Sequence, residues 1–124
     1  MCGILAIFGL SESSETWRSK VLQMSKRIRH RGPDWNGIYC GKNCILAHER
    51  LAIVGLISGA QPIIDKSGEI IMTVNAEIYN YKELKKDLIS KDPKYKDEFI
   101  TDSDCEVLIH LYKEYGVDFL KKIH

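Results

Sequence analysis

Hydrophobic and polar positions follow two different periods along this chain, and together they predict a mixed α and β domain. The continuous apolar run GILAIF at 3–8 indicates a strand that is buried on both faces. Apolar residues then recur every three or four positions over 14–30, which predicts an amphipathic helix. This helix should end before Arg31-Gly32-Pro33-Asp34, because the glycine and proline there interrupt helical structure.

The middle of the chain is typical of strands joined by turns. Residues 37–48 alternate around the polar turn at 41–43 and predict a hairpin, whose second arm can extend through 51–54. A loop containing glycine and proline is expected at 58–65, and the apolar run at 69–75 predicts a further strand.

The last third of the chain is predicted to be helical. A helix opens at 80–83, and a polar loop is expected at 91–98. Ser103 followed by Glu106 is a capping-box pattern that predicts the start of another helix, and 117–123 predicts a final short one. Only about three or four short strands are identifiable, fewer than a stable sheet protein usually pairs. The chain is therefore expected to be part of a larger fold.

The composition is that of an ordinary globular domain. The 124 residues are 44% hydrophobic and 28% charged, and the net charge of +1 gives no reason to expect a strongly charged partner. No stretch approaches the roughly 20 apolar residues of a membrane span, and no positive segment precedes the apolar run at 3–10. The four cysteines do not resemble a secreted disulfide scaffold. We therefore expect a reducing, cytoplasmic setting without a membrane partner.

Cys2 is the residue with the most distinctive chemical potential. If Met1 is removed, Cys2 carries a thiol and a free α-amine on the same carbon. The thiolate is the nucleophilic form of cysteine, so a base must remove the thiol proton. A free α-amine titrates within about one pH unit of neutrality and is suited to that task, directly or through a water. The alternative interpretation is a small buried cysteine at the start of a strand.

Three further segments carry the polar groups that an α-amino acid substrate needs. Arg50 supplies a cation for a carboxylate, Asp104 together with Glu77 supplies anions for an ammonium, and Asn75 supplies a donor for an amide oxyanion. Each also has a structural interpretation. Arg50 can be an exposed cation, Asn75 can begin a turn, and Asp104 can complement a helix dipole.

Two weaker patterns favour structural interpretations. Cys40, Cys44 and His48 are evenly spaced like zinc ligands, but a hairpin explains the spacing and no fourth ligand is evident, so no metal is expected. The basic run at 26–31 has no interleaved aromatic residues. It is more typical of a solvated helix end than of a nucleic-acid surface.

Six stretches together resemble the N-terminal glutaminase domain of asparagine synthetases, within the class II glutamine amidotransferases. They occur in the family's order and cover nearly the whole chain. The opening MCGI is shared by several related amidotransferases, whereas RHRGPDW and AHERLAIV resemble asparagine synthetases more than the phosphoribosyl or hexosamine enzymes. The stretches are MCGI at 1–4, RHRGPDW at 29–35, AHERLAIV at 47–54, GAQP at 59–62, EIYN at 77–80 and SDCEV at 103–107.

The resemblance implies a role for each matching residue. Cys2 would attack L-glutamine with its own amine as base, and hydrolysis of a γ-glutamyl thioester would give glutamate and ammonia. The Asn75 side chain and the Ala76 backbone N–H would form the oxyanion hole. The remaining residues would bind the substrate's carboxylate and ammonium: Arg50, the pocket-lining Leu51, Ala52, Ile53 and Val54, and the acidic pair Glu77 and Asp104.

The resemblance also implies a fold and a larger protein. The fold would be the α+β, four-layer αββα sandwich of N-terminal-nucleophile hydrolases, incomplete in this chain. Residues 1–124 would be the N-terminal part of the glutaminase domain and would hold no cofactor. ATP and Mg²⁺ are expected only in a C-terminal synthetase domain that is absent here, where ammonia would convert ATP-activated aspartate to asparagine. A homodimer is compatible with this organisation.

One departure from the family keeps alternatives open. The family has glycine where this chain has Ala76, and alanine is costly if φ is positive at that position. One alternative is therefore a weakly active or inactive glutaminase-like module that binds or regulates. Another is a related class II amidotransferase that delivers ammonia to a different acceptor.

Overall fold

The computed structural model describes residues 1–52 and 58–124, which form two compact units. The first unit contains the described residues up to 52 together with 60–63 and 72–75, and the second contains 58–59, 64–71 and 76–124. Both helices and strands are present, which confirms the predicted mixed α and β class. None of the helices in the described ranges has the length and apolar content that a bilayer crossing requires.

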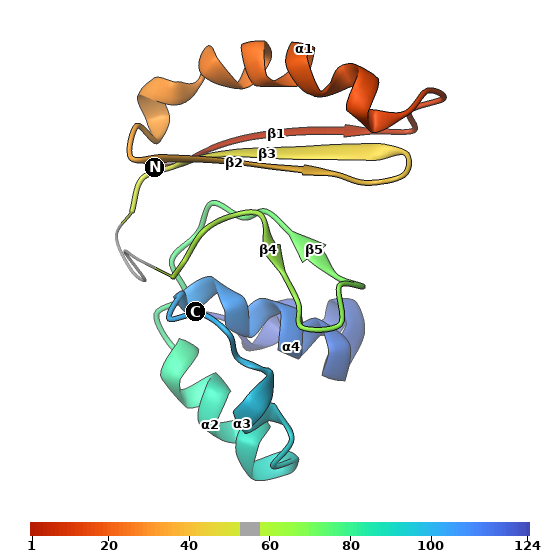
Figure 1. The fold of residues 1–124 in the computed structure, drawn as a ribbon. Coiled ribbons are helices and arrows are strands. Elements are labelled where there is room, and N and C mark those ends of the chain that lie inside the picture. The colour runs from red at the N-terminus through yellow and green to blue at the C-terminus, as the bar shows by residue number, and fades with distance from the viewer. Residues whose placement is uncertain (53–57) are drawn as a thin grey trace. The chain divides into compact units, whose positions relative to one another are not determined.

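The first unit is an antiparallel three-stranded sheet with a helix on one face (Figure 1). Its strands are β1 (Gly3–Phe8), β2 (Trp35–Cys40) and β3 (Cys44–Arg50), in the spatial order β1-β3-β2. The helix α1 (Ser14–Lys26) covers the sheet. The predicted strand at 3–8 and hairpin at 37–48 are thus confirmed.

The core of this unit lies between α1 and β3. Val21 from the helix and Ile45 and Ala47 from the strand are completely buried there. Successive side chains of a strand point to opposite faces, so Ile45 and Ala47 face the helix while His48 and Arg50 face the other way. The strand that forms the core therefore carries polar groups on its second face.

The register between β1 and β3 determines which residues meet at the start of the chain. Gly3 pairs with Glu49, and Ile4 pairs with His48. Arg50 is the last residue of β3 and pairs with the first residue of β2. Cys2, which directly precedes Gly3, therefore lies at the same end of the β1–β3 ladder as Arg50.

Two predictions for the first unit are wrong. We expected the strand at 3–8 to be buried on both faces, but Ile4 and Phe8 are 39% and 72% exposed. In the described sheet β1 pairs only with β3, and α1 covers one face, so alternate β1 side chains remain exposed. The helix predicted for 14–30 ends at Lys26, and a short 3-10 turn, η1 (Arg29–Arg31), follows.

The turn that follows η1 is sterically constrained. The chain must turn after η1 so that Gly32 can lie directly against the end of β3. A Cβ atom at Gly32 would stand only 2.1 Å from the Glu49 carbonyl oxygen, so no side chain fits there. Asp34 N–H then donates to the Arg50 carbonyl at 3.0 Å, which joins the turn to β3.

A second, two-stranded sheet is formed by β4 (Ile63–Ile64) and β5 (Ile71–Met72). The loop predicted at 58–65 thus contains a short strand, and the strand predicted at 69–75 is reduced to β5. Between the two strands the backbone N–H of Asp65 donates to the Ile70 carbonyl, and the Asp65 carboxylate accepts the Ile70 N–H. These two bonds close the turn and fix where β4 ends and β5 begins.

The second unit is mainly helical, and its core contains the buried Leu84 and Leu88 of the first long helix and Leu108 and Leu111 of the last. The predicted helices near 80, 103 and 117 are confirmed in type, although the last is a 3-10 helix. The elements are α2 (Tyr81–Lys91), α3 (Tyr95–Glu98), η2 (Asp104–Glu106), α4 (Val107–Tyr115) and η3 (Gly116–Lys122).

Two details of this unit differ from prediction. The loop expected at 91–98 contains α3, because Tyr95 is buried and its hydroxyl donates to Glu114 at 2.8 Å. The capping box is only half formed. The Ser103 hydroxyl accepts the Cys105 N–H, but the Glu106 carboxylate accepts the backbone N–H groups of residues 100 and 101 instead. The buried Glu106 thus holds the preceding loop.

Candidate active site

The Cys2 sulfur lies against the backbone of Leu51. The Leu51 N–H donates to Sγ at 3.3 Å, and the thiol donates to the Leu51 carbonyl oxygen at 3.6 Å. An N–H donor stabilises negative charge on an acceptor more than it stabilises a neutral group. The Leu51 backbone therefore fixes the position of the sulfur through both of its peptide groups.

The backbone of Cys2 is fixed on both sides. Its N–H donates to the Asn75 side-chain oxygen Oδ1 at 3.0 Å, and its carbonyl oxygen accepts the Nε–H of Arg31 at 3.0 Å. An amide side chain has separate donor and acceptor groups. Because Asn75 uses its oxygen on Cys2, its Nδ2 hydrogens can point to another acceptor.

Arg50 provides a buried positive charge at this end of the sheet. Its side chain is buried, with 6% exposure, on the face opposite α1. Burial, and after it the charge of Arg50, lower the pKa of the neighbouring His48 from 6.5 to about 4. His48 is therefore neutral near pH 7, and its Nδ1 is 2.7 Å from the Thr73 hydroxyl. Near neutral pH, only Arg50 of this pair carries a positive charge.

The predicted pocket-lining backbone is described in part. Leu51 contacts the Cys2 sulfur, and the Ala52 N–H donates to Asp34 Oδ2 at 2.9 Å. Ile53 and Val54, which the resemblance also places in the pocket, lie outside the described residues. The two described residues continue from β3 and present their backbone to side chains elsewhere in the first unit.

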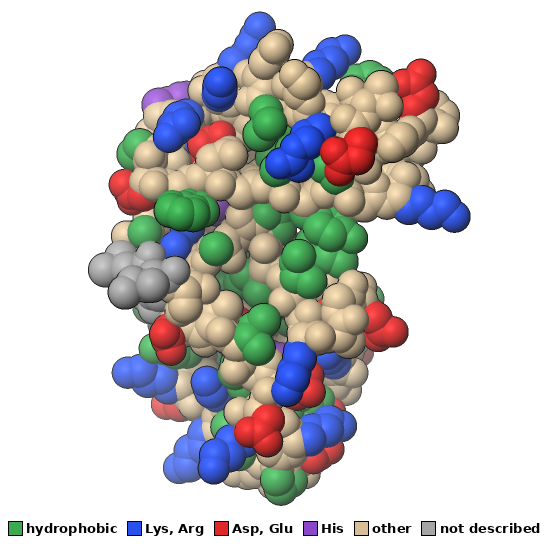
Figure 2. All heavy atoms as spheres, viewed as in Figure 1, with side chains coloured by type: hydrophobic (Ala, Val, Ile, Leu, Met, Phe, Trp, Pro, Cys, Tyr) green, Lys and Arg blue, Asp and Glu red, His purple; other side chains and the backbone are tan. Residues whose placement is uncertain are grey.

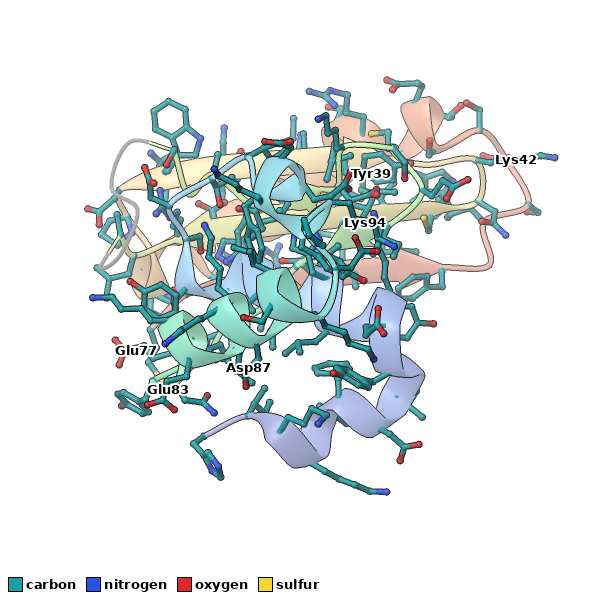
Figure 3. The ribbon with its side chains drawn as sticks, turned by 90° about the horizontal axis from the view of Figure 1, so that it is seen from below. Tyr39, Lys42, Glu77, Glu83, Asp87 and Lys94 are labelled. Atoms are coloured by element: carbon teal, nitrogen blue, oxygen red, sulfur yellow. The ribbon has the colours of Figure 1, made fainter. Side chains whose placement is uncertain are left out.

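The predicted ammonium-binding residues lie in the second unit. The Asp104 carboxylate, 7% exposed, accepts the Ile78 N–H at 2.7 Å, and the neighbouring Cys105 thiol lies 3.4 Å from the Ala76 carbonyl oxygen. The turn at 104–105 thus holds the segment 76–78. Asp104 does more than complement a helix dipole, because its carboxylate binds an amide outside its own helix. The Glu77 carboxylate extends into solvent (Figure 3).

Ala76 adopts a backbone conformation that does not require glycine. None of the described residues other than glycine has a positive φ. The cost that we attached to alanine at this position depended on a positive φ, and that condition is not met. The Ala76 N–H is therefore retained as a donor without backbone strain.

The structure brings the predicted residues together in two sets, one in each unit. In the first unit Cys2 is bonded to Leu51 and to Asn75, and Arg50 directly precedes Leu51. In the second unit Asp104 is bonded to the residue that follows Glu77. The two sets are joined by the peptide bond between residues 75 and 76, which are the predicted oxyanion donors.

Two residues at the site were not predicted individually. Arg31 contacts the Cys2 carbonyl, and Asp34 contacts Ala52. Both belong to the RHRGPDW stretch, which we used only for the resemblance. The signal that could have identified them is the Gly-Pro pair, because such a turn brings its flanking polar residues close to another segment.

The structure separates the residues of the weak zinc pattern. Cys44 and His48 lie four residues apart on one strand, a distance of about 13 Å, and Cys40 pairs with Ile45, which faces α1. Within the described ranges no three His, Cys, Asp or Glu side chains form a group that could hold a metal ion. On the face drawn in Figure 2, basic and acidic side chains are interspersed on both units.

A hollow of about 280 Å³ in the second unit contains none of the predicted site residues. It lies along α2, whose Glu83 and Asp87 side chains (Figure 3) contribute to its wall together with Leu88 and Tyr115. The predicted chemistry is therefore not located in this hollow, and Cys2 with its contacts is the candidate site.

Comparison with known proteins gives consistent results. A family model described as glutamine amidotransferase domain matches residues 1–124. The chain is 51% identical to asparagine synthetase (glutamine-hydrolyzing) 2 of Oryza sativa subsp. japonica, 50% to asparagine synthetase (glutamine-hydrolyzing) of Zea mays and 52% to a probable asparagine synthetase (glutamine-hydrolyzing) of Dictyostelium discoideum. Each match covers 97% of this chain but only 19%, 20% and 21% of those relatives.

The resemblance inferred from the six stretches is thus confirmed. The chain spans about one fifth of the length of the curated relatives it matches.

Proposed function

Because this chain belongs to the glutamine amidotransferase domain family, we propose that it hydrolyses the side-chain amide of L-glutamine to glutamate and ammonia. The observation that carries the proposal is the position of Cys2. Its sulfur is 3.3 Å from a backbone N–H of Leu51, and its own nitrogen is 3.0 Å from the Asn75 side chain. A cysteine that only filled the core would not need an amide N–H donor at its sulfur and a side-chain acceptor at its nitrogen.

The reaction begins once removal of Met1 leaves Cys2 with a free amine. This amine accepts the thiol proton, and Sγ attacks the amide carbon of glutamine. The carbon–nitrogen bond breaks, ammonia leaves with that proton, and a γ-glutamyl thioester remains on Cys2. Water then attacks the thioester, the carbon–sulfur bond breaks, and the sulfur recovers a proton as glutamate leaves. Asn75 Oδ1 orients the amine toward the sulfur throughout.

Asn75 and Ala76 stabilise the negative charge that develops on the amide oxygen. The Asn75 Nδ2 hydrogens and the Ala76 N–H are donors on consecutive residues, and the Asn75 oxygen already accepts from Cys2. Preorganised donors of this kind are typically worth about 3–4 kcal/mol each in a transition state. Unstrained backbone at residue 76 supports an active site, and so favours this function over an inactive binding module.

Recognition of glutamine uses its two charged groups. The Arg50 guanidinium binds the α-carboxylate, with the backbone of Leu51 and Ala52 beside it, and Glu77 with Asp104 binds the α-ammonium. Arg50 is suited to this role because the neighbouring His48 is neutral near pH 7 and does not compete as a cation. Asp104 is suited because the Ile78 N–H fixes the orientation of its buried carboxylate.

In the whole protein we propose that the ammonia is used for asparagine synthesis in the cytoplasm. The relatives named as asparagine synthetases are about five times longer than the matched region, which supports a C-terminal synthetase domain that binds ATP and Mg²⁺. We also propose that the complete glutaminase domain is a four-layer αββα sandwich. The helix-covered sheet of the first unit, with Ile4 and Phe8 exposed on its second face, suits a layer that packs against another sheet. A homodimer is part of the same proposal.

The decisive test is covalent labelling of the full-length protein with a thiol-reactive glutamine analogue such as 6-diazo-5-oxo-norleucine. We expect one adduct, on Cys2, in protein whose N-terminal mass shows that Met1 is absent. Cys2→Ala should abolish ammonia release while glutamine still binds. Retained turnover in that variant, or no adduct on the processed wild-type protein, would refute the nucleophile assignment.

A further inference from the structure

We propose that Asp34 is a positioning residue that holds the Leu51 backbone against the Cys2 sulfur. This inference rests on the proposed glutamine hydrolysis, since it assigns Asp34 a function in preparing the nucleophile. Asp34 does not touch the sulfur itself. It acts through the segment that follows β3.

The hydrogen bonds of Asp34 lie on either side of Leu51. The Asp34 backbone N–H donates to the Arg50 carbonyl at 3.0 Å, and its Oδ2 accepts the Ala52 N–H at 2.9 Å. One residue thus bonds to the positions immediately before and after Leu51. The orientation of the Leu51 peptide groups is set by these two neighbours.

This arrangement matters because β3 ends at Arg50. At Leu51 and Ala52, the two described residues that follow, no strand ladder fixes the backbone. Leu51 must nevertheless direct its N–H to Sγ, at 3.3 Å, and its carbonyl oxygen to the same sulfur, at 3.6 Å. A hydrogen bond weakens steeply when its angle or distance changes. The Ala52–Asp34 bond therefore preserves the geometry that the ladder no longer provides.

The turn that carries Asp34 is itself fixed to the sheet. Gly32 packs so closely on β3 that a Cβ atom would lie 2.1 Å from the Glu49 carbonyl oxygen, and Pro33 restricts the next φ angle. From the same turn, Arg31 donates to the Cys2 carbonyl at 3.0 Å. The 31–34 segment thus holds both partners of the sulfur contact, Cys2 on one side and residues 50–52 on the other.

The test compares Asp34→Ala with Asp34→Asn in the full-length protein. Alanine removes the acceptor for Ala52, whereas asparagine keeps an oxygen in the same place. The first readout is the alkylation rate of Cys2 by iodoacetamide at fixed pH, followed by peptide mass spectrometry, with Cys40 in the same sample as internal control. This reagent does not need the glutamine pocket. The second readout is kcat and KM for ammonia release.

We expect Asp34→Ala to slow Cys2 alkylation and lower kcat by about fivefold or more, the effect of losing one hydrogen bond to a charged group. Alkylation of Cys40 should not change. Asp34→Asn should stay within about twofold of the wild type on both readouts, because its oxygen still accepts the Ala52 N–H. If alanine gives no folded protein, Asp34→Ser, whose hydroxyl is too short to reach, replaces it.

Two results would overturn the inference. One is Cys2 alkylation in Asp34→Ala that is as fast as in the wild type. The other is an Asp34→Asn variant as slow as Asp34→Ala, which would mean that charge and not a hydrogen bond acts here. The proposed function fails separately, if the processed wild-type protein releases no ammonia, whatever the alkylation rates of the variants.

Discussion

A single methyl group distinguishes residue 76 from the glycine expected in the family. Its backbone N–H is one of the two oxyanion donors that we propose, and a donor of this type acts only if its direction is correct. The described backbone contains no positive φ outside glycine, so the methyl group imposes no strain on Ala76. Its carbonyl oxygen is also held by the Cys105 thiol, at 3.4 Å.

We therefore expect Ala76→Gly to leave glutaminase turnover unchanged or to raise it slightly, within about threefold. Glycine gains backbone freedom in the unfolded chain, so a small loss of stability, about 0.5–1 kcal/mol, should accompany the change. Steady-state ammonia release and urea unfolding of the same preparation measure both effects. A tenfold fall in turnover would instead mean that the methyl group contributes favourably to the site.

His48 is a buried histidine on the same face of β3 as Arg50. Burial and Arg50 lower its pKa from 6.5 to about 4, so between these values the unfolded chain binds more protons than the folded one. The free energy of unfolding must therefore fall as the pH falls through that window. Below pH 4 His48 is protonated in both the folded and the unfolded protein, so it causes no further loss of stability.

The predicted size is about 2 kcal/mol of stability lost between pH 7 and pH 5 from His48 alone. Urea unfolding of wild-type protein and His48→Gln at both pH values isolates this contribution, because the other ionisable groups are common to the two. Glutamine keeps a polar group near Thr73 but does not titrate. An equal pH dependence in wild type and variant would contradict the assignment.

At the scale of elements, the turn between β4 and β5 depends on one buried carboxylate. Burial alone would raise the pKa of Asp65, but hydrogen bonds from Lys113, Ser67 and Ile70 outweigh it and hold the pKa well below its usual range. The Lys113 ammonium is 2.7 Å away. Because the folded pKa is depressed, the stabilisation is fully present at neutral pH and is lost only in acid.

Asp65→Ala should destabilise the protein by about 1–3 kcal/mol, because it leaves the half-buried Ile70 N–H without its acceptor and removes the nearer of the two carboxylates that pair with Lys113. Asp118→Ala is the matched control. It removes a carboxylate that pairs with Lys121 but is 70% exposed, and such surface pairs contribute roughly 0–1 kcal/mol. In thermal unfolding, Asp65→Ala should lower the Tm clearly more than Asp118→Ala does. Equal shifts of Tm in the two variants would contradict the structural role of Asp65.

At the scale of the whole molecule, the proposed glutaminase supplies ammonia to a separate synthetase domain. The two reactions should then be separable by a change at Cys2, because only the first uses the thiol. Full-length Cys2→Ala is expected to lose glutamine-dependent asparagine formation completely and to retain formation from added ammonium salts. Cys44→Ala, which lies on β3 away from the predicted site residues, should retain both activities.

Product formation from glutamine and from ammonium, each assayed with aspartate and ATP, measures the separation. Asparagine formation from glutamine in Cys2→Ala would contradict the nucleophile. Loss of both activities in a folded Cys2→Ala protein would contradict the division of labour between domains. If the wild-type protein shows neither activity, the result favours a related amidotransferase with a different acceptor.

Much of the element order was predictable from local pattern. The strand at 3–8, the hairpin at 37–48 and the helices near 14, 80 and 103 follow from periodicity and turn residues, which act over a few neighbouring positions. The failures have tertiary causes. α3 contains Tyr95, which is buried and hydrogen-bonded to Glu114, and the turn between β4 and β5 is closed by Asp65.

The sequence by itself determined which chemical groups this protein has: a cysteine that can become N-terminal, an arginine after a strand, and an amide next to a backbone donor. Only the tertiary structure decided what orients them. Cys2 contacts Leu51 and Asn75, which are 49 and 73 residues away, and no local pattern encodes such pairings. Arg31 and Asp34 hold that arrangement through a turn whose neighbours in space are distant in sequence, so their roles became evident only once the chain was folded.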